Sequence, residues 1–244
     1  MTLQPVEMTI ETINYPTIAV PEGPFLMGTI PTELRKTDHE EPQREVNLDA
    51  YYIGKYLVTN AQYAQFVETT GCVPPRFHTD PRFNSPNFPV VGVTWHDAQA
   101  FLEWLNDLAG ERYRLLTEAE WEKAARGADG REYPWGNEWD ASKANSSESR
   151  LKQLTPVGSY PDGASPYGCY DMAGNTYEWC ADWFHPQTYQ YSPTRNPQGP
   201  VDGRRKVIRG GSWIAQGKFA TRCANRAACE PIESLHNLGI RIAR

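Results

Sequence analysis

The chain has 244 residues and a formal net charge of -6, with eight Trp, 13 Tyr, eight Phe, 19 Gly and 20 Pro. This composition predicts irregular backbone held by aromatic clusters, not a helical bundle or a regular α/β sheet. The negative charge argues against general nucleic-acid binding, and no stretch approaches the roughly 20 apolar residues of a membrane helix. A chain that begins at Met1 without a basic and apolar leader is expected to be cytoplasmic.

Short apolar runs indicate strands in both halves of the chain. Residues 23–28 read as a buried strand, and residues 44–53 alternate Val46, Leu48 and Ala50, which predicts one strand. Residues 1–20 form a lead-in that can include an edge strand. Two more short strands are expected at 155–158 and 207–209. No internal repeat or linker is visible, so a single compact domain of small helices, short strands and long loops is the simplest account.

Three segments carry the same signal for the start of a helix. Thr59, Thr94 and Thr117 each precede a Gln, Asp or Glu three residues later, which is the pattern of a capping box. The second helix should bury Ala98, Phe101, Leu102 and Leu105. The third should bury Trp121, Ala124 and Ala125 and end at Gly127.

Five cysteines, odd in number and irregularly spaced, are expected to be reduced and mostly buried. They are Cys72, Cys169, Cys180, Cys223 and Cys229. The last two form the only close pair, and their spacing leaves two interpretations open: a redox or soft-metal pair, or two buried structural residues.

Scattered histidines give no support for an iron or zinc site. They are His39, His78, His96, His185 and His236, and none is spaced as a ligand pair on a helix. The sequence also lacks a phosphate-binding glycine loop, and Ser212 does not lie in a nucleophile-elbow pattern.

Residues 170–183 combine four aromatic side chains with three carboxylates around a turn at 173–175. Gly174 and Asn175 tolerate left-handed backbone angles, so a sharp turn entering a strand is predicted. Alternation then places Tyr177 and Trp179 on one face and Glu178 on the other. Asp171, turn carbonyls and Glu178 can converge on a calcium ion, or the segment can be a solvated acidic turn beside an aromatic core.

Motifs along nearly the whole chain resemble the formylglycine-generating-enzyme (sulfatase-modifying factor) family, in the family's order. They read PEGPFLMG (21–28), YLVTNAQYAQF (56–66), PVVGVTWHDA (89–98), RLLTEAEWEKAAR (114–126), PWG (134–136), YGCYDMAGNTYEW (167–179), RGGSW (209–213) and NLGIR (237–241). The resemblance implies an α+β fold, a variant of the C-type lectin fold with two to three short helices, short strands and much irregular structure. It covers residues 18–244 as one domain after a lead-in at 1–17.

The resemblance also implies bound structural calcium. Asp171 and Glu178 side chains, with the carbonyls of Gly174 and Thr176, match one calcium site of the family. A second family site falls near Asn145 and Ser146, where the following loop is shorter and lacks the matching acidic residue.

The catalytic cysteines of the family are missing. Formylglycine-generating enzymes oxidise a peptide cysteine with copper held by two cysteines, and the matching positions here are Ala215 and Ala220. Alanine supplies no thiolate, so no copper or iron is expected and the chain should not make formylglycine. The alternative is an oxidoreductase of the same family whose altered metal site uses Cys223, Cys229 or His236.

The chain also resembles the variable proteins of diversity-generating retroelements, whose hypervariable segment follows a Gly-Gly-Ser-Trp turn. The leading hypothesis is a non-catalytic binding domain for a protein or small-molecule ligand, diversified or fixed, with residues 214–236 as its binding surface. The candidate ligand-binding residues are Trp213, Ile214, Ala215, Gln216, Lys218, Phe219, Ala227, Ala228, Cys229, Leu235 and His236.

Overall fold

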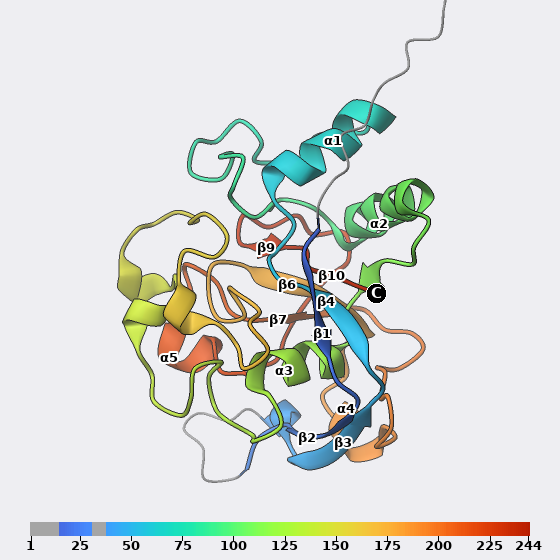
Figure 1. The fold of residues 1–244 in the computed structure, drawn as a ribbon, viewed down its shortest axis with the longest axis vertical. Helices are drawn as coiled ribbons and strands as arrows, with labels where there is room; N and C mark the ends of the chain where they lie inside the picture. The colour runs from blue at the N-terminus through green and yellow to red at the C-terminus, as the bar shows by residue number, and fades with distance from the viewer. Residues whose placement is uncertain (1–14, 31–37) are drawn as a thin grey trace, which may run out of the picture.

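The computed structural model describes residues 15–30 and 38–244 (Figure 1). Within these ranges three helices run over several turns and two are single turns. They are α1 Asn60–Thr70, α2 Trp95–Ala109, α3 Glu118–Arg126, α4 Thr188–Tyr191 and α5 Gly217–Ala220. The strands are β1 Thr17–Val20, β2 Gly23–Met27, β3 Arg44–Leu48, β4 Tyr51–Gly54, β5 Arg114–Leu115, β6 Tyr177–Trp183, β7 Lys206–Arg209, β8 Ala227–Cys229, β9 Leu238–Gly239 and β10 Ile242–Ala243.

The strands form two four-stranded sheets and one two-stranded sheet. One sheet has the order β1-β4-β10-β5, the second pairs β2 with β3, and the third has the order β8-β7-β6-β9. The C-terminal strand β10 lies between β4 and β5, and β9 runs parallel to β6. The last residues of the chain therefore join two sheets that begin far apart in the sequence, as the red segment at the centre of Figure 1 shows.

All three predicted capping boxes are confirmed. Thr59, Thr94 and Thr117 each accept a hydrogen bond from the backbone N–H three residues on, and the side chain at that position returns a bond to the cap backbone. Helix α2 buries Ala98, Phe101, Leu102 and Leu105, as its periodicity predicts, and Gly127 follows α3 at the expected position.

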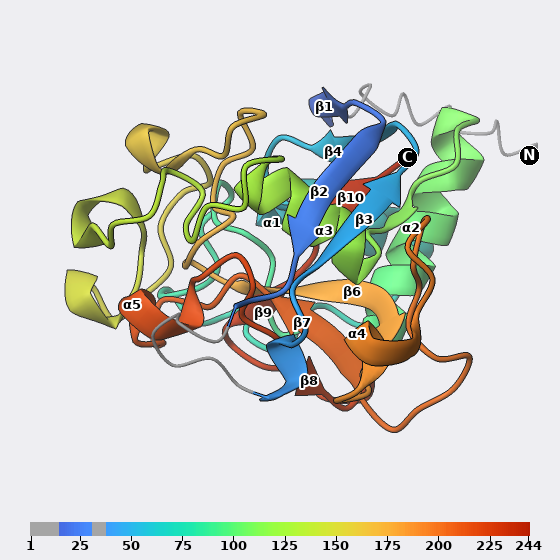
Figure 2. The ribbon, with the colours of Figure 1, turned by 90° about the horizontal axis from the view of Figure 1, so that it is seen from below.

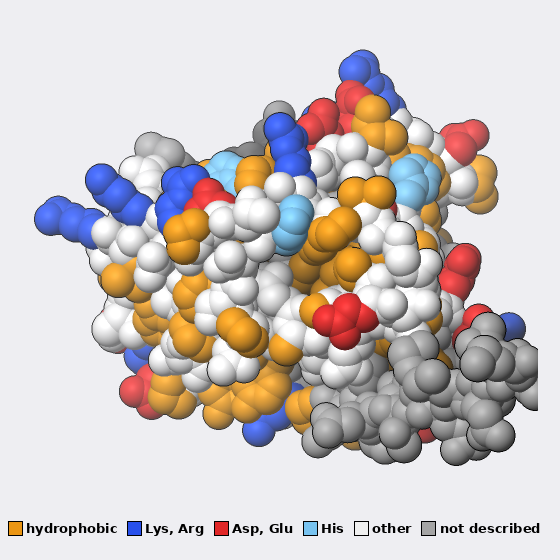
Figure 3. Space-filling model, turned by 90° about the horizontal axis from the view of Figure 1, so that it is seen from above, with side chains coloured by type: hydrophobic (Ala, Val, Ile, Leu, Met, Phe, Trp, Pro, Cys, Tyr) orange, Lys and Arg blue, Asp and Glu red, His pale blue; other side chains and the backbone are white. Residues whose placement is uncertain are grey.

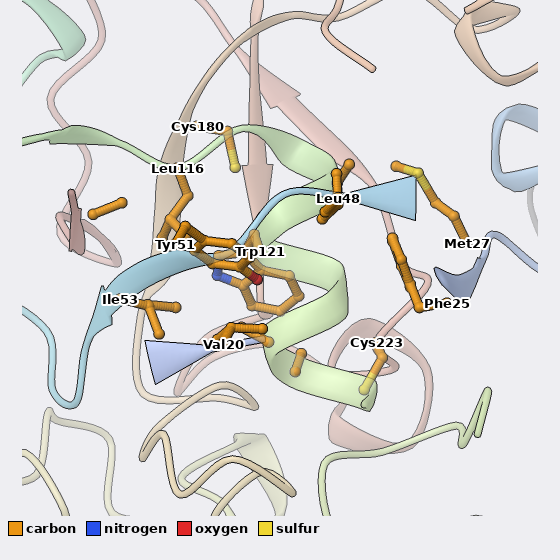
Figure 4. Close-up of a cluster of buried hydrophobic side chains, with 14 of the residues drawn as sticks. Val20, Phe25, Met27, Leu48, Tyr51, Ile53, Leu116, Trp121, Cys180 and Cys223 are labelled. Carbon is orange, nitrogen blue, oxygen red and sulfur yellow. The ribbon is translucent and has the colours of Figure 1, made fainter. Parts of the chain in front are cut away.

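A hydrophobic core surrounds α3 (Figure 4). Trp121 of this helix is fully buried and lies among side chains from β1, β2, β3 and β4. Cys180 and Cys223 reach the same core from β6 and from the segment after α5. A second core lies beneath α1 and α2 and contains Phe101 and Trp179. Strand β6 separates the two cores, since Trp179 faces one and Cys180 the other, which confirms the predicted alternation.

Two strand predictions are wrong. Residues 44–53 form β3 and β4, because the chain bends at Asp49 and Ala50 so that β3 pairs with β2 and β4 pairs with β1. Residues 155–158 form no strand. The N–H of Thr155 bonds the side chain of Asn175 and that of Val157 bonds the carbonyl of Asn87, so no strand partner remains for this segment. The predicted edge strand within residues 1–20 is present as β1, which lies at the edge of its sheet. Residues 1–14 of that segment lie outside the described residues.

The face that carries α1 is hollowed. A pocket of about 290 Å³ opens between α1 and the segment 74–86, lined by Tyr63, Val67 and Pro75 among others. Figure 3 shows hydrophobic side chains gathered around a hollow on this face. The longest helix of the described ranges is α2 with 15 residues, and none of the helices found there could cross a lipid bilayer.

Candidate functional site

The turn before β6 has the predicted left-handed geometry. Gly174 has φ 79° and Asn175 has φ 60°. A Cβ added at Gly174 would lie 2.3 Å from the carbonyl oxygen of Asn145, so a side chain cannot be accommodated there. The N–H of Asn175 donates to that same carbonyl at 2.7 Å. The turn is therefore held by its packing against residue 145.

Glu178 is fully buried at the end of this turn and binds protein donors with both oxygens. The guanidinium of Arg241 donates Nε–H to Oε2 and a terminal N–H to Oε1, each at 2.8 Å. The indole N–H of Trp121 donates to Oε2 at 2.8 Å. Arg241 also donates to the carbonyls of Gly54 and Tyr170, so one buried arginine ties Glu178 to two other segments.

Asp171 is buried close to this pair. Its Oδ2 accepts from the N–H of Gly158 at 2.7 Å. Burial raises the pKa of Asp171 to about 6, and the neighbouring charge of Glu178 adds to that rise, while Arg241 opposes it.

These contacts bear on the predicted calcium site. The carboxylate of Glu178 is already neutralised by Arg241, and a second cation would share its oxygens with a guanidinium. Asp171, by contrast, is a buried carboxylate whose charge lacks a direct counterion in the described residues. Those residues hold no cluster of three or more His, Cys, Asp or Glu side chains that could bind a metal, so turn carbonyls such as those of Gly174 and Thr176 would have to complete any site.

Asn145 and Ser146, at the second family position, are buried and hydrogen-bonded within the protein. The Asn145 amide donates to the carbonyl of Gln153 and to the side chain of Asn175, and its oxygen accepts from Ser149. The Ser146 hydroxyl donates to Glu148. Hydrogen bonds of the loop itself thus occupy the groups that would serve a cation there.

The segment after Trp213 presents its side chains from a fixed backbone. The N–H of Ser147 donates to the carbonyl of Ala215 at 3.0 Å, and the N–H of Gly217 donates to the carboxylate of Glu148. A Cβ at Gly217 would lie 2.2 Å from the ring of Trp139, which explains a glycine at that position. Ile214, Gln216 and Lys218 are exposed, and Ala215, Phe219 and Ala220 are half-buried.

Three buried arginines hold the end of this segment. Arg209 donates to the carbonyls of Cys223, Ala224 and Asn225. Arg222 forms a bidentate pair with Glu40 at 2.9 Å, and Arg226 forms one with Glu118 at 2.6 and 2.8 Å. Each guanidinium is buried, so these ion pairs fix the path of residues 221–226 from beneath.

Trp213 and His236 are brought together, although 22 residues separate them. Their ring centroids lie 5.5 Å apart, and both rings contact Phe83. Phe77 also contacts His236, so the segment 74–86 forms a second wall that the sequence analysis missed. Two phenylalanines in a proline-rich loop gave no signal for this placement. The buried indole N–H of Trp213 has no hydrogen-bond partner within the described residues.

Four other candidate residues lie apart from this surface. Ala227, Ala228 and Cys229 form the edge strand β8, which is three strands away from β9 in the sheet order. Neighbouring strands are spaced about 4.8 Å apart, so β8 and β9 are separated by roughly 14 Å. Leu235 packs, like Ala227 and Cys229, against the core beneath α2. The structure thus divides the candidate residues into an exposed group around α5, the Trp213–His236 contact, and a group that packs on the core.

The five cysteines are free thiols, as predicted, and all except Cys72 are buried. Burial raises the pKa of Cys223 to about 12 and that of Cys229 to about 11. The two belong to different hydrophobic cores. A protonated, separated pair is poorly suited to bind a soft metal or to form a disulfide.

Comparison with known proteins agrees with this architecture. Residues 6–244 match the family described as sulfatase-modifying factor enzyme 1-like domain. The formylglycine-generating enzyme of Streptomyces coelicolor is 35% identical over 285 residues, covering 93% of this chain and 88% of that protein. The serine/threonine-protein kinase pkn1 of Chlamydia caviae is 37% identical over 91% of this chain, which spans only 37% of the kinase.

Solved structures show the same fold. PvdO from Pseudomonas aeruginosa superposes with a TM-score of 0.83 at 29% identity and 93% coverage of both chains. Treponema denticola variable protein 1 superposes with a TM-score of 0.79 at 24% identity, over 93% of this chain and 94% of that one. At that identity the second match speaks for the fold alone. Together, the family match, the relatives and the fold show that this chain belongs to the sulfatase-modifying factor family and has the formylglycine-generating-enzyme type of C-type lectin fold.

Proposed function

We propose that this chain is a non-catalytic binding domain whose ligand contacts come from residues 213–219 and His236. The observation that carries the proposal is that hydrogen bonds hold the backbone of this segment while several of its side chains are exposed. The carbonyl of Ala215 accepts from the N–H of Ser147, the N–H of Gly217 donates to Glu148, and Arg222 donates to the carbonyl of Phe219. The side chains of Ile214, Gln216 and Lys218 are exposed. A rigid support that presents a mixed apolar and polar surface is suited to recognition, because little conformational freedom is lost on binding.

The residue types at the family's copper positions also support a binding role. Ala215 precedes α5 and Ala220 is its last residue, and the resemblance places two cysteines at these positions. Burial raises the pKa of the Cys223 and Cys229 thiols, so neither offers a ready replacement for a copper ligand. His236 is enclosed by three aromatic rings, and burial lowers its pKa.

The test is an assay for formylglycine on a sulfatase-type cysteine peptide, with copper and a reducing agent present. We expect no aldehyde and no oxygen consumption from the natural chain. The matched control is the double variant Ala215→Cys with Ala220→Cys, which restores the family's ligands and should gain copper affinity. Aldehyde production by the natural chain would contradict the proposal.

We propose further that the surface is diversified between copies of the gene, as in the variable proteins of retroelements. Deep sequencing of the 3′ end of the gene from its source population tests this. Substitutions confined to codons such as 214, 215, 216 and 218, with the codons for Arg209 and Arg226 fixed, are the expected result. A uniform sequence would leave a binding domain with one fixed ligand.

Calcium is proposed as a structural ion at the turn before β6, bound chiefly by Asp171 and turn carbonyls. The buried carboxylate of Asp171 supports this, since a cation would offset the cost of its charge. Glu178 would contribute less than the family pattern implies, because Arg241 already pairs with it. The ion would stabilise the turn and make no contact with the ligand.

A further inference from the structure

A cleft of about 730 Å³ lies away from the proposed binding surface. It is bounded by the start of α2, the end of β6, the start of β7 and the segment 196–201. Figure 2 shows α5 on one side of the molecule and the end of β6, next to α4, on the other. The volume falls within the range of small-molecule sites, which is roughly 300 to 1,000 Å³.

Lys206 lines this cleft from the first position of β7. Its Nζ lies 4.1 Å from the ring centroid of Trp95 and 3.8 Å from that of Trp183, and it donates to the carbonyl of Ala181 at 2.8 Å. No carboxylate of the described residues forms an ion pair with it. The amine is therefore held between two indole rings, with one neutral acceptor and no counterion in contact.

Such surroundings favour the neutral amine. Burial lowers the pKa of Lys206 to about 8, and the charge of Asp182 opposes the fall. Asp182 lines the same cleft, and its carboxylate accepts backbone N–H bonds from Glu118 and Gly199. Burial raises the pKa of Asp182 to about 6. A nucleophilic amine and a carboxyl that can exchange a proton near neutral pH thus face one cavity.

We propose that Lys206 forms a reversible imine with a small aldehyde or ketone bound in this cleft. The lone pair of Nζ attacks the carbonyl carbon to give a carbinolamine. Asp182 then donates a proton to the hydroxyl of the carbinolamine, which leaves as water while the nitrogen lone pair forms the carbon–nitrogen double bond of the protonated imine. The Asp182 carboxylate can take the proton back from the nitrogen to give the neutral imine. No oxidant or reductant is consumed, and hydrolysis reverses the step.

Charged groups on the surrounding elements are mostly paired among themselves. Arg114 binds Glu120 at 2.7 Å, and Arg204 binds Glu230 at 2.7 Å. His96 at the start of α2 is exposed and contacts the ring of Trp95. Asp182 remains as the acid that acts on Lys206.

The test is reductive trapping in the intact protein. The protein is incubated with glyoxylate and cyanoborohydride at pH 7 and digested, and the label at each lysine is measured by mass spectrometry. Lys206 should be labelled at least about tenfold faster than the exposed Lys152 and Lys218, because far more of its amine is neutral at this pH.

Two variants separate reactivity from accessibility. Lys206→Arg keeps a cation between the indoles and should fold normally but show no label in that peptide, while the label at Lys152 stays unchanged. Asp182→Asn should slow labelling of Lys206 relative to Lys152 in the same sample. The proposal is overturned if Lys206 is labelled no faster than Lys152, or stays unlabelled while Lys152 reacts.

Discussion

At the scale of single residues, the ion pair of Glu178 and Arg241 is the most consequential contact of the turn before β6. Both side chains are fully buried and joined by two hydrogen bonds. Replacing Arg241 by Met would leave a buried carboxylate without a counterion, which costs about 3–5 kcal/mol. Urea denaturation should show this loss. The exposed pair of Arg204 and Glu230 provides the control, since Arg204→Met should change the unfolding free energy by less than about 1 kcal/mol.

Asp171 gives the molecule a pH dependence of known sign. Its folded pKa of about 6 is raised above the ordinary value, so its protonated form is favoured by folding. Its contribution to stability is complete below about pH 4 and is lost as the pH rises through 6. With a chelator present, Asp171→Asn should gain stability relative to the natural chain between pH 4 and 7, by up to about 3 kcal/mol. The exposed Asp162→Asn should show no such trend.

Bound calcium should offset the loss of stability that ionised Asp171 causes at neutral pH. At pH 7 we expect the proposed ion to raise the melting temperature of the natural chain and, at one hundred times its Kd, to add about 2.7 kcal/mol to the unfolding free energy. The increase should vanish in Asp171→Asn, and magnesium should reproduce little of it. Identical melting curves in calcium and in chelator would disprove the proposed ion.

At the scale of elements, α1, α2 and α3 each begin directly after a threonine that caps the helix. Thr94 accepts from the backbone of Asp97 at 3.0 Å, and Asp97 accepts in return from the backbone of Thr94 at 2.8 Å. Thr94→Ala should lower the unfolding free energy by about 1 kcal/mol. Thr69, in the last turn of α1 and exposed, is the control, and its replacement by Ala should be neutral or slightly stabilising. Equal effects at the two positions would contradict the capping argument.

Features that depend on nearby residues could be predicted from the sequence. Features that depend on pairing between distant segments could not. The capping boxes, the buried face of α2 and the alternation along β6 each depend on residues a few positions apart. The break between β3 and β4 depends on which sheet each half joins, and nothing within residues 44–53 specifies this. For the site, the turn at Gly174 was visible in the sequence. The pairing of Glu178 with Arg241, 63 residues later, was not.

At the scale of the whole molecule, Glu122 at the centre of α3 connects three distant segments to its own helix. It accepts from the N–H of Gly28 and from Arg126, and it also pairs with Arg209 and Tyr189. All of these side chains are buried. Glu122→Gln removes the charge that two buried arginines need.

The expected loss for Glu122→Gln is about 3–5 kcal/mol, measured by urea denaturation. Because Arg209 holds residues 223–225, the same variant should speed hydrogen exchange in that segment. Glu233→Gln, at an exposed position outside the network, should change neither quantity. A stable Glu122→Gln protein with unchanged exchange would show that the network does not fix the segment.

The position of β10 has a consequence for synthesis. This strand completes the sheet between β4 and β5, and Arg241 just before it closes the pair with Glu178. The fold is therefore complete only after Arg241 and β10 have been synthesised and have joined these partners. A frameshift or stop codon within codons 214–236 would remove both β9 and β10, leaving a product that cannot fold and that proteases would clear. Only a gene read in frame through the proposed binding segment would therefore yield stable protein.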